Sequence, residues 1–261
     1  MLRSAGTGLG WEMASSSEKD ALGKRIVEAL YERGLIRTWY RDKPEGWTLV
    51  SGAWSPFYIQ LRPVCSHPEL LRDVSDALGR MIRDEAPHVT KIVGVAMAGI
   101  PLAVAASLSC RLPCLYTRKL EGVRSAEELA EAIQRYGEHA MVEGELADGD
   151  RLVVVDDLVT RFDSKLIAVR QVEHEVGRLR LQDVTCEDVA VVLDREQGAA
   201  ETAREHGIRL HALVPFATNA LDWLADVMAP LERETIKDYL TQPDAYQSPE
   251  KQAELARAAA S

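Results

Sequence analysis

Two adjacent carboxylates are the residues whose types and spacing most directly suggest chemistry. Asp156 and Asp157 follow a run of three valines, so an apolar strand brings both to its end. Adjacent residues of a strand point to opposite faces, but both can reach one ligand where the strand turns. Such a pair can accept hydrogen bonds from vicinal hydroxyls, as in a ribose, and can hold a magnesium shell through water. The spacing fits two solvated turn aspartates equally well.

Basic residues follow two other apolar strands. Arg118 and Lys119 stand where an anion could be clamped, although such a pair is also common as surface charge. Arg195 follows "VVLD", and its planar guanidinium suits a carboxylate or the edge of a base. The alternative for Arg195 is an ion pair with Asp194 or Glu196.

The elements that must position these residues alternate between strand and helix. Nearly continuous Val, Ile and Leu in the strands indicate a parallel sheet buried on both faces, and hence a doubly wound α/β fold. Ligands bind such sheets at the carboxyl ends of the strands. Gly94 and Gly99 flank one of these ends and would allow a ligand to approach the backbone. We predict strands at 91–97, 113–119, 151–156, 187–194 and 210–215, and helices at 100–110, 163–177, from 198 and at 219–228.

The flanking segments have a different pattern. A helix is expected from Ser17 to the stop at Gly34, and the stretch 47–62 alternates like a hairpin around Ser51-Gly52. A second amphipathic helix begins at Pro68. Residues 120–150 form a long excursion with a short helix at about 125–135.

Composition excludes several classes of function. The net charge is −10, and there is no Lys/Arg run, so binding to nucleic acid or to a membrane surface is not expected. No apolar stretch reaches the roughly 20 residues that span a bilayer. The four cysteines have neither C-x-x-C nor zinc spacing and are read as free thiols in a reducing cytoplasm.

Taken together, these segments resemble the orotate phosphoribosyltransferases, a branch of the type I phosphoribosyltransferases. "VVVDDLVT" is similar to the diphosphate-sugar motif of all type I enzymes. "WTLVSGAWSPFYIQLR" and "LDREQGA" are similar to two segments of the orotate branch. The resemblance covers roughly residues 20–225.

The resemblance implies a role for each matching residue in binding orotate and phosphoribosyl diphosphate. Asp156 and Asp157 would hold the ribose hydroxyls, and the loop from Thr160 to Ser164 would face the 5′-phosphate. Diphosphate would contact Arg118 and Lys119, with Lys119 acting catalytically, also in the site of a neighbouring subunit. Arg195 and Thr160 would contact orotate. Tyr58, Ala98 and Tyr136 are further substrate-binding positions, and Mg²⁺ is expected, held through substrate and water rather than directly by the protein.

The resemblance also implies the domain organisation. A flexible tail at 1–16 precedes one phosphoribosyltransferase domain at 17–235. Within it, an N-terminal helix and hairpin at about 17–65 form a hood over the sheet, and about 120–140 is an insertion. A polar tail follows at 236–261, either mobile or a peripheral helix. A homodimer in the cytoplasm is expected.

Two loops depart from the family pattern. The loop after the aspartates is typically T-[TA]-G-G-[ST], but here it contains Arg161, Phe162 and Asp163. Asp163 is expected to cap the next helix and so to compete with phosphate for its N–H groups. In the catalytic loop, Gln134 and Tyr136 stand in place of a lysine and a histidine.

Three functions therefore stay open. The first is orotate phosphoribosyl transfer, as in pyrimidine nucleotide biosynthesis. The second is a non-catalytic or regulatory nucleotide-binding protein of the same fold, which the two altered loops favour. The third is transfer to another base, against which "DREQG" argues.

Overall fold

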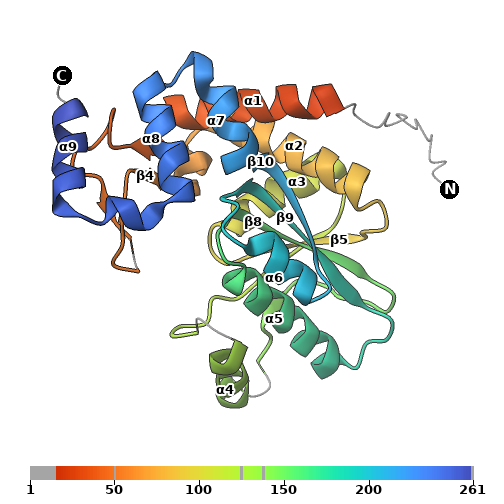
Figure 1. The fold of residues 1–261 in the computed structure, drawn as a ribbon. Helices are drawn as coiled ribbons and strands as arrows, with labels where there is room; N and C mark the ends of the chain where they lie inside the picture. Colours follow the sequence, from red (N-terminus) through yellow and green to blue (C-terminus); the bar gives the residue numbers. More distant parts are fainter. Residues whose placement is uncertain (1–15, 50, 124–125, 137–138, 260–261) are drawn as a thin grey trace.

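A six-stranded sheet forms the centre of the computed structural model, which describes residues 16–49, 51–123, 126–136 and 139–259 (Figure 1). The strand order is β10-β9-β8-β5-β6-β7, and every neighbouring pair is parallel except β6 and β7. The predicted doubly wound, mainly parallel α/β fold is confirmed. The strands are β5 (Lys91–Gly94), β6 (Cys114–Thr117), β7 (Val142–Glu143), β8 (Arg151–Val159), β9 (Thr185–Asp194) and β10 (Arg209–Pro215).

Helices cover both faces of this sheet, which explains the uninterrupted apolar strands. Val153 and Val155 of β8 pack into the core shared with α2 (Pro68–Glu85) and α3 (Gly99–Cys110). The alternate residues Leu152 and Val154 pack into the core beneath the opposite helices. These are α5 (Asp163–Leu179) and α6 (Ala199–Glu205), which lie together on one side of the strands in Figure 1.

The N-terminal hood consists of α1 (Ser16–Glu32) and four short strands. Strand β2 (Trp47–Thr48) pairs antiparallel with β3 (Trp54–Ser55), and Gly52 in the turn has φ +84°. The predicted hairpin is therefore present, but it is shorter than 47–62. Strand β4 (Phe57–Ile59) instead pairs antiparallel with β1 (Ile36–Thr38). A 3₁₀ turn (Arg62–Ser66) leads into α2.

The C-terminal segment is helical, and a peripheral helix was one of the two alternatives predicted for 236–261. Helix α8 (Pro230–Thr241) continues across residue 235, and a 3₁₀ turn (Pro243–Tyr246) leads to α9 (Pro249–Ala259). Between β10 and α8, residues 216–226 form short helical turns that include α7 (Leu221–Trp223). A few large side chains of this segment carry its burial, namely Tyr239, Tyr246 and Leu255. Figure 1 shows α8 and α9 beside the hood.

The remaining segments lie away from the sheet centre. Helix α4 (Ala126–Tyr136) agrees with the short helix predicted in the excursion, and its Leu129 is buried in a small cluster with Met141. The predicted flexible tail, 1–16, lies outside the described residues apart from Ser16. Within the described ranges, none of the helices combines the length and the apolar character that a bilayer crossing requires.

Candidate active site

Asp156 and Asp157 lie where the sheet changes its direction of winding. Strand β5 has β6 on one side and β8 on the other, and its last pair with β8 is Gly94 with Val155. Strand β8 continues to Val159 against β9, so both aspartates belong to the strand and not to a turn after residue 156. Because β5 has already ended, a cleft opens beside them. Such a switch point is the usual ligand site of a doubly wound sheet.

This cleft, of about 320 Å³, brings five of the predicted site residues together. Its lining comprises Tyr58, Ala98, Asp156, Asp157 and Ser164, together with Ile59, Gln60, Arg62, Val95, Ala96, Met97, Leu158 and Lys165. The hood therefore contributes one wall and the sheet edge the other. We call it the switch-point cleft.

Gly94 and Gly99 were expected to let a ligand approach the backbone, but protein atoms occupy the space beside both. A Cβ on Gly99 would lie 2.2 Å from the Val155 carbonyl oxygen, and one on Gly94 would lie 2.9 Å from the Cβ of Ala103. Both glycines let the start of α3 approach the strands closely, so their partner is the protein itself rather than a ligand.

The two carboxylates are buried and oriented by their own strand. Asp156 Oδ1 accepts a hydrogen bond from the Asp157 amide at 2.9 Å, and Asp157 Oδ1 accepts one from the Leu158 amide at 2.8 Å. Burial and the neighbouring Asp156 carboxylate raise the pKa of Asp157 to about 6, against the opposing effect of Lys165. At neutral pH Asp157 is therefore mostly ionised and able to accept hydrogen bonds from hydroxyls.

The altered loop keeps a glycine-like backbone in spite of Phe162. Phe162 has φ +79°, in the left-handed region that L-residues seldom adopt. Its ring is 1% exposed and packs into the core beneath α5. The phenylalanine thus fills the interior and leaves the mouth of the loop open, while Arg161 and Asp163 are exposed.

Asp163 does not cap α5, which corrects the prediction. The cap position is Phe162, and no side chain makes a capping hydrogen bond there. Asp163 is instead the first residue of the helix, and its side chain is exposed. No acceptor is found in the described chain for the amides of residues 161–164. Free first-turn amides of this kind favour anions.

Arg195 lies at the end of β9, next to the hood. Its guanidinium carbon is 5.0 Å from the centre of the Phe57 ring, and its Nε is buried without a hydrogen-bond partner in the described chain. Burial lowers its pKa. The predicted alternative, an ion pair with Asp194 or Glu196, is not formed among the described residues; Glu196 accepts hydrogen bonds from Thr218 instead. An arginine in this state is suited to a carboxylate ligand.

The other predicted residues lie outside the switch-point cleft. Thr160 lines a neighbouring hollow that shares Leu158 and Ser164 with it. Arg118 follows β6, and its Nε lies 3.5 Å from Glu143 of β7. Lys119 is exposed beside it. Tyr136 ends α4, and its side chain lies outside the described part of the structure.

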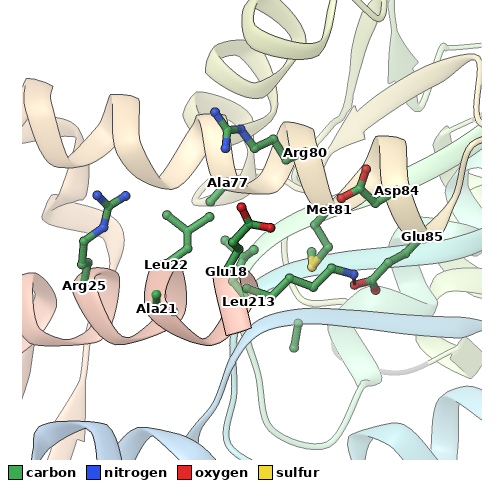
Figure 2. Close-up of a pocket in the computed structure, with 13 residues that line it drawn as sticks. Glu18, Ala21, Leu22, Arg25, Ala77, Arg80, Met81, Asp84, Glu85 and Leu213 are labelled. Atoms are coloured by element: carbon green, nitrogen blue, oxygen red, sulfur yellow. Dashed lines mark hydrogen bonds and ion pairs between the residues drawn. The ribbon is translucent and has the colours of Figure 1, made fainter. Parts of the chain in front are cut away.

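A second cleft, of about 430 Å³, lies between α1, α2 and β10 (Figure 2). Leu22, Met81 and Leu213 give it an apolar floor, and charged side chains such as Arg25 and Arg80 surround the rim. It contains none of the predicted site residues and lies away from the carboxyl ends of the strands. We therefore place the chemistry in the switch-point cleft.

Lys165 is the site residue that sequence reasoning missed. Its ammonium group lies 2.7 Å from Asp156 Oδ2, and the side chain is 6% exposed. A lysine in the first turn of a helix is unfavourable for the helix dipole. The position of Lys165 in the first turn was the signal in the sequence, because a lysine there is stabilised only if an anion lies nearby.

Comparison with known proteins identifies the family. No family model matches the chain. The chain is 31% identical over 195 residues to the orotate phosphoribosyltransferase of Methanothermobacter thermautotrophicus, covering 75% of this chain and 92% of that enzyme. The chain belongs to the orotate phosphoribosyltransferase family. A second member, from Methanosphaera stadtmanae, is 32% identical over 192 residues and is covered to 92% of its length.

Two solved structures share the fold of this chain. The UMP synthase of Leishmania donovani has a TM-score of 0.64 at 24% identity, covering 84% of this chain and 42% of that one. The orotate phosphoribosyltransferase of Aeropyrum pernix has a TM-score of 0.54 at 24% identity, covering 72% and 93%. The resemblance noted in the sequence is confirmed by these relatives.

Proposed function

We propose that this protein is an orotate phosphoribosyltransferase, which converts orotate and 5-phosphoribosyl 1-diphosphate to orotidine 5′-monophosphate and diphosphate. One observation carries the proposal: a buried carboxylate pair lines the switch-point cleft, and the free amides of residues 161–164 belong to the loop that lines the adjoining hollow, which shares Leu158, Ser164 and Lys165 with the cleft. The pair suits ribose hydroxyls, and the amides suit the 5′-phosphate. Groups suited to the ribose and groups suited to the phosphate thus lie next to each other.

The chain would act by holding and orienting both substrates. Asp156 and Asp157 would accept hydrogen bonds from the ribose hydroxyls and favour the positive charge that develops on the ribose as its bond to diphosphate loosens. Arg195 would pair with the carboxylate of orotate, which satisfies the guanidinium that the protein leaves without a buried partner. Arg118 and Lys119, after the adjacent strand, are the cations proposed for the departing diphosphate.

Magnesium fits this donor set only as a substrate-held ion. The described residues contain no group of three or more His, Cys, Asp or Glu side chains placed to hold a metal. Mg²⁺ commonly binds through one or two carboxylates together with substrate phosphates and water. When bound, Mg²⁺ would neutralise charge on the diphosphate leaving group. Asp156 and Asp157 are the carboxylates we propose to hydrogen-bond its water ligands.

We also propose a homodimer in the cytoplasm. Helix α3 exposes Leu108 to 79% and Val104 to 45%, and Met97 just before it is 66% exposed. Large apolar side chains gathered on one helix are typical of a protein contact surface. The four free cysteines support a reducing compartment. The mass in solution, compared with 28.9 kDa for one chain, decides the oligomeric state.

Base recognition can be tested through Arg195. We expect Arg195→Gln to raise the KM for orotate by about tenfold to a hundredfold, because a charge-assisted pair is lost, with little change in the KM for phosphoribosyl diphosphate. Arg209→Gln is the control, since Arg209 lies at the opposite end of the sheet. A transfer to adenine or uracil faster than to orotate in the unaltered protein would favour another base.

A further inference from the structure

Lys165 occupies the space between the two halves of the proposed sugar-phosphate site. It lines the switch-point cleft as the third residue of α5, and its side chain is 6% exposed. Its ammonium group forms an ion pair with Asp156 Oδ2 at 2.7 Å and donates hydrogen bonds to the Leu158 carbonyl and to Ser164 Oγ at 3.2 Å. Two of its three N–H donors are therefore used in hydrogen bonds, and its charge is paired with Asp156.

The three contacts differ in what they hold. Asp156 belongs to the carboxylate pair, whereas Ser164 belongs to the loop that faces the phosphate. At 3.2 Å, the contact with Ser164 is longer than the 2.7 Å contact with Asp156, and it joins the ammonium to the hydroxyl of an exposed residue. It is therefore the contact that an arriving anion can replace most readily.

The helix does not itself favour a cation at this position. Positive charge in the first turn opposes the helix dipole, and a buried lysine needs paired acceptors. The carboxylate of Asp156 is the paired acceptor that carries the opposite charge. The free amides of residues 161–164 lie within the same turn, and Lys165 lines both the switch-point cleft and the adjoining hollow that these residues line.

We propose that Lys165 is a substrate-binding residue that contacts the 5′-phosphate of the substrate. On binding, its ammonium exchanges the Ser164 hydroxyl for a phosphate oxygen and keeps its pair with Asp156, so that one cation joins the ribose and phosphate subsites. This inference rests on the proposed function.

Inorganic phosphate is the probe that separates this role from a merely structural one. Phosphate has no ribose hydroxyls, so its affinity does not depend on Asp156. We expect Lys165→Met to weaken the binding of inorganic phosphate and of phosphoribosyl diphosphate by about tenfold to a hundredfold in calorimetry. Lys165→Arg should recover part of both. The KM for orotate should change little.

Lys91→Met is the matched control. Lys91 makes an ion pair of the same length, 2.7 Å, with Asp150, and its side chain is 15% exposed, but it starts β5 at the far end of the sheet. We expect a comparable loss of thermal stability and unchanged affinity for both probes. If Lys165→Met does not fold, Lys165→Arg and Lys165→Gln are compared in the same way.

The outcomes distinguish this inference from the proposed function. An active unaltered protein whose Lys165 variants bind inorganic phosphate as tightly as before would overturn the role of Lys165 and leave the function intact. Binding of both probes, weakened in the variants, but without transfer to orotate, would support Lys165 and overturn the assigned reaction. An unaltered protein that binds neither probe would overturn both.

Discussion

At the scale of single residues, Phe162 combines a glycine-like backbone with a buried ring. A left-handed conformation costs an L-residue roughly 1–2 kcal/mol. Loss of a buried phenylalanine side chain costs about 3–5 kcal/mol. The buried ring therefore stabilises a left-handed turn that an L-residue would otherwise disfavour.

Phe162 gives a prediction about the order of two variants. Both Phe162→Ala and Phe162→Gly should be destabilised, but the glycine variant should be the more stable of the two by about 1 kcal/mol, because only glycine relieves the positive φ. Urea unfolding measures the difference. Ala168→Gly in the middle of α5 is the control and should show the ordinary order, with alanine more stable. An alanine variant more stable than the glycine variant at 162 would contradict the strained turn.

Asp157 gives a prediction about pH. Since its pKa is raised to about 6 by burial and by Asp156, it takes up a proton as the pH falls below that value. We expect kcat/KM for phosphoribosyl diphosphate to fall below about pH 6, because a protonated carboxyl accepts hydrogen bonds poorly. The same proton stabilises the fold: this contribution is fully present below the unfolded pKa of about 4 and is lost as the pH rises through about 6. Asp157→Asn should remove the pH dependence of both kcat/KM and stability in this range. If kcat/KM of that variant still fell below about pH 6, another group would be responsible for the fall.

At the scale of elements, a buried glutamate joins the C-terminal helices to the hood. Glu232 of α8 is 1% exposed and accepts hydrogen bonds from Tyr31 of α1 at 3.0 Å and from the Thr38 hydroxyl of β1. Further along α8, Tyr239 donates to the Trp54 carbonyl at 3.1 Å and packs edge-on against Phe57, the ring beneath Arg195. The C-terminal segment thus supports the wall of the site that the hood provides.

Replacement of Glu232 should therefore loosen the hood. We expect Glu232→Ala to lower the free energy of unfolding by about 2–4 kcal/mol, because two buried hydroxyls lose their acceptor. Glu234→Ala, on the exposed side of the same helix, should change it by no more than about 0.5 kcal/mol. Equal effects of the two substitutions in thermal or urea unfolding would contradict this role for Glu232.

At the scale of the whole molecule, one charge network joins the helices to the far end of the sheet. Asp188 of β9 is 1% exposed and pairs with His211 at 2.8 Å, with Arg209 and with His88. His211 also lies 3.0 Å from Glu85 of α2, which pairs with Lys19 of α1. Burial alone would lower the pKa of His211, but hydrogen bonds to Asp188 and Glu85 raise it to about 9.

This network predicts a loss of stability in alkaline solution. The folded-state pKa of His211 lies above the unfolded value of about 6.5, so its stabilisation is complete below pH 6.5 and is lost as the pH rises through about 9. We expect a decrease of about 2–3 kcal/mol over that range, measured by urea unfolding. In His211→Gln the decrease should disappear. A variant with the same alkaline slope as the unaltered protein would show that other groups cause it.

The sequence predicted the sheet and the edge that carries the site, because buried parallel strands are nearly continuous in Val, Ile and Leu. Side-chain direction was not predictable in the same way. Nothing local shows that Phe162 turns inward, that Asp163 leaves the helix end uncapped, or that Lys165 reaches back to Asp156. The packing of the C-terminal segment was not predictable from its polar composition, because Tyr239 and Tyr246 contact Trp54, about 190 residues earlier.

The most direct test of the account is the transferase reaction itself. Folded protein is mixed with orotate, phosphoribosyl diphosphate and Mg²⁺, and the loss of orotate absorbance is followed together with the release of diphosphate. The account predicts that both occur in equal amounts and that each requires both substrates. A well-folded protein that binds phosphoribosyl diphosphate but consumes no orotate would contradict it.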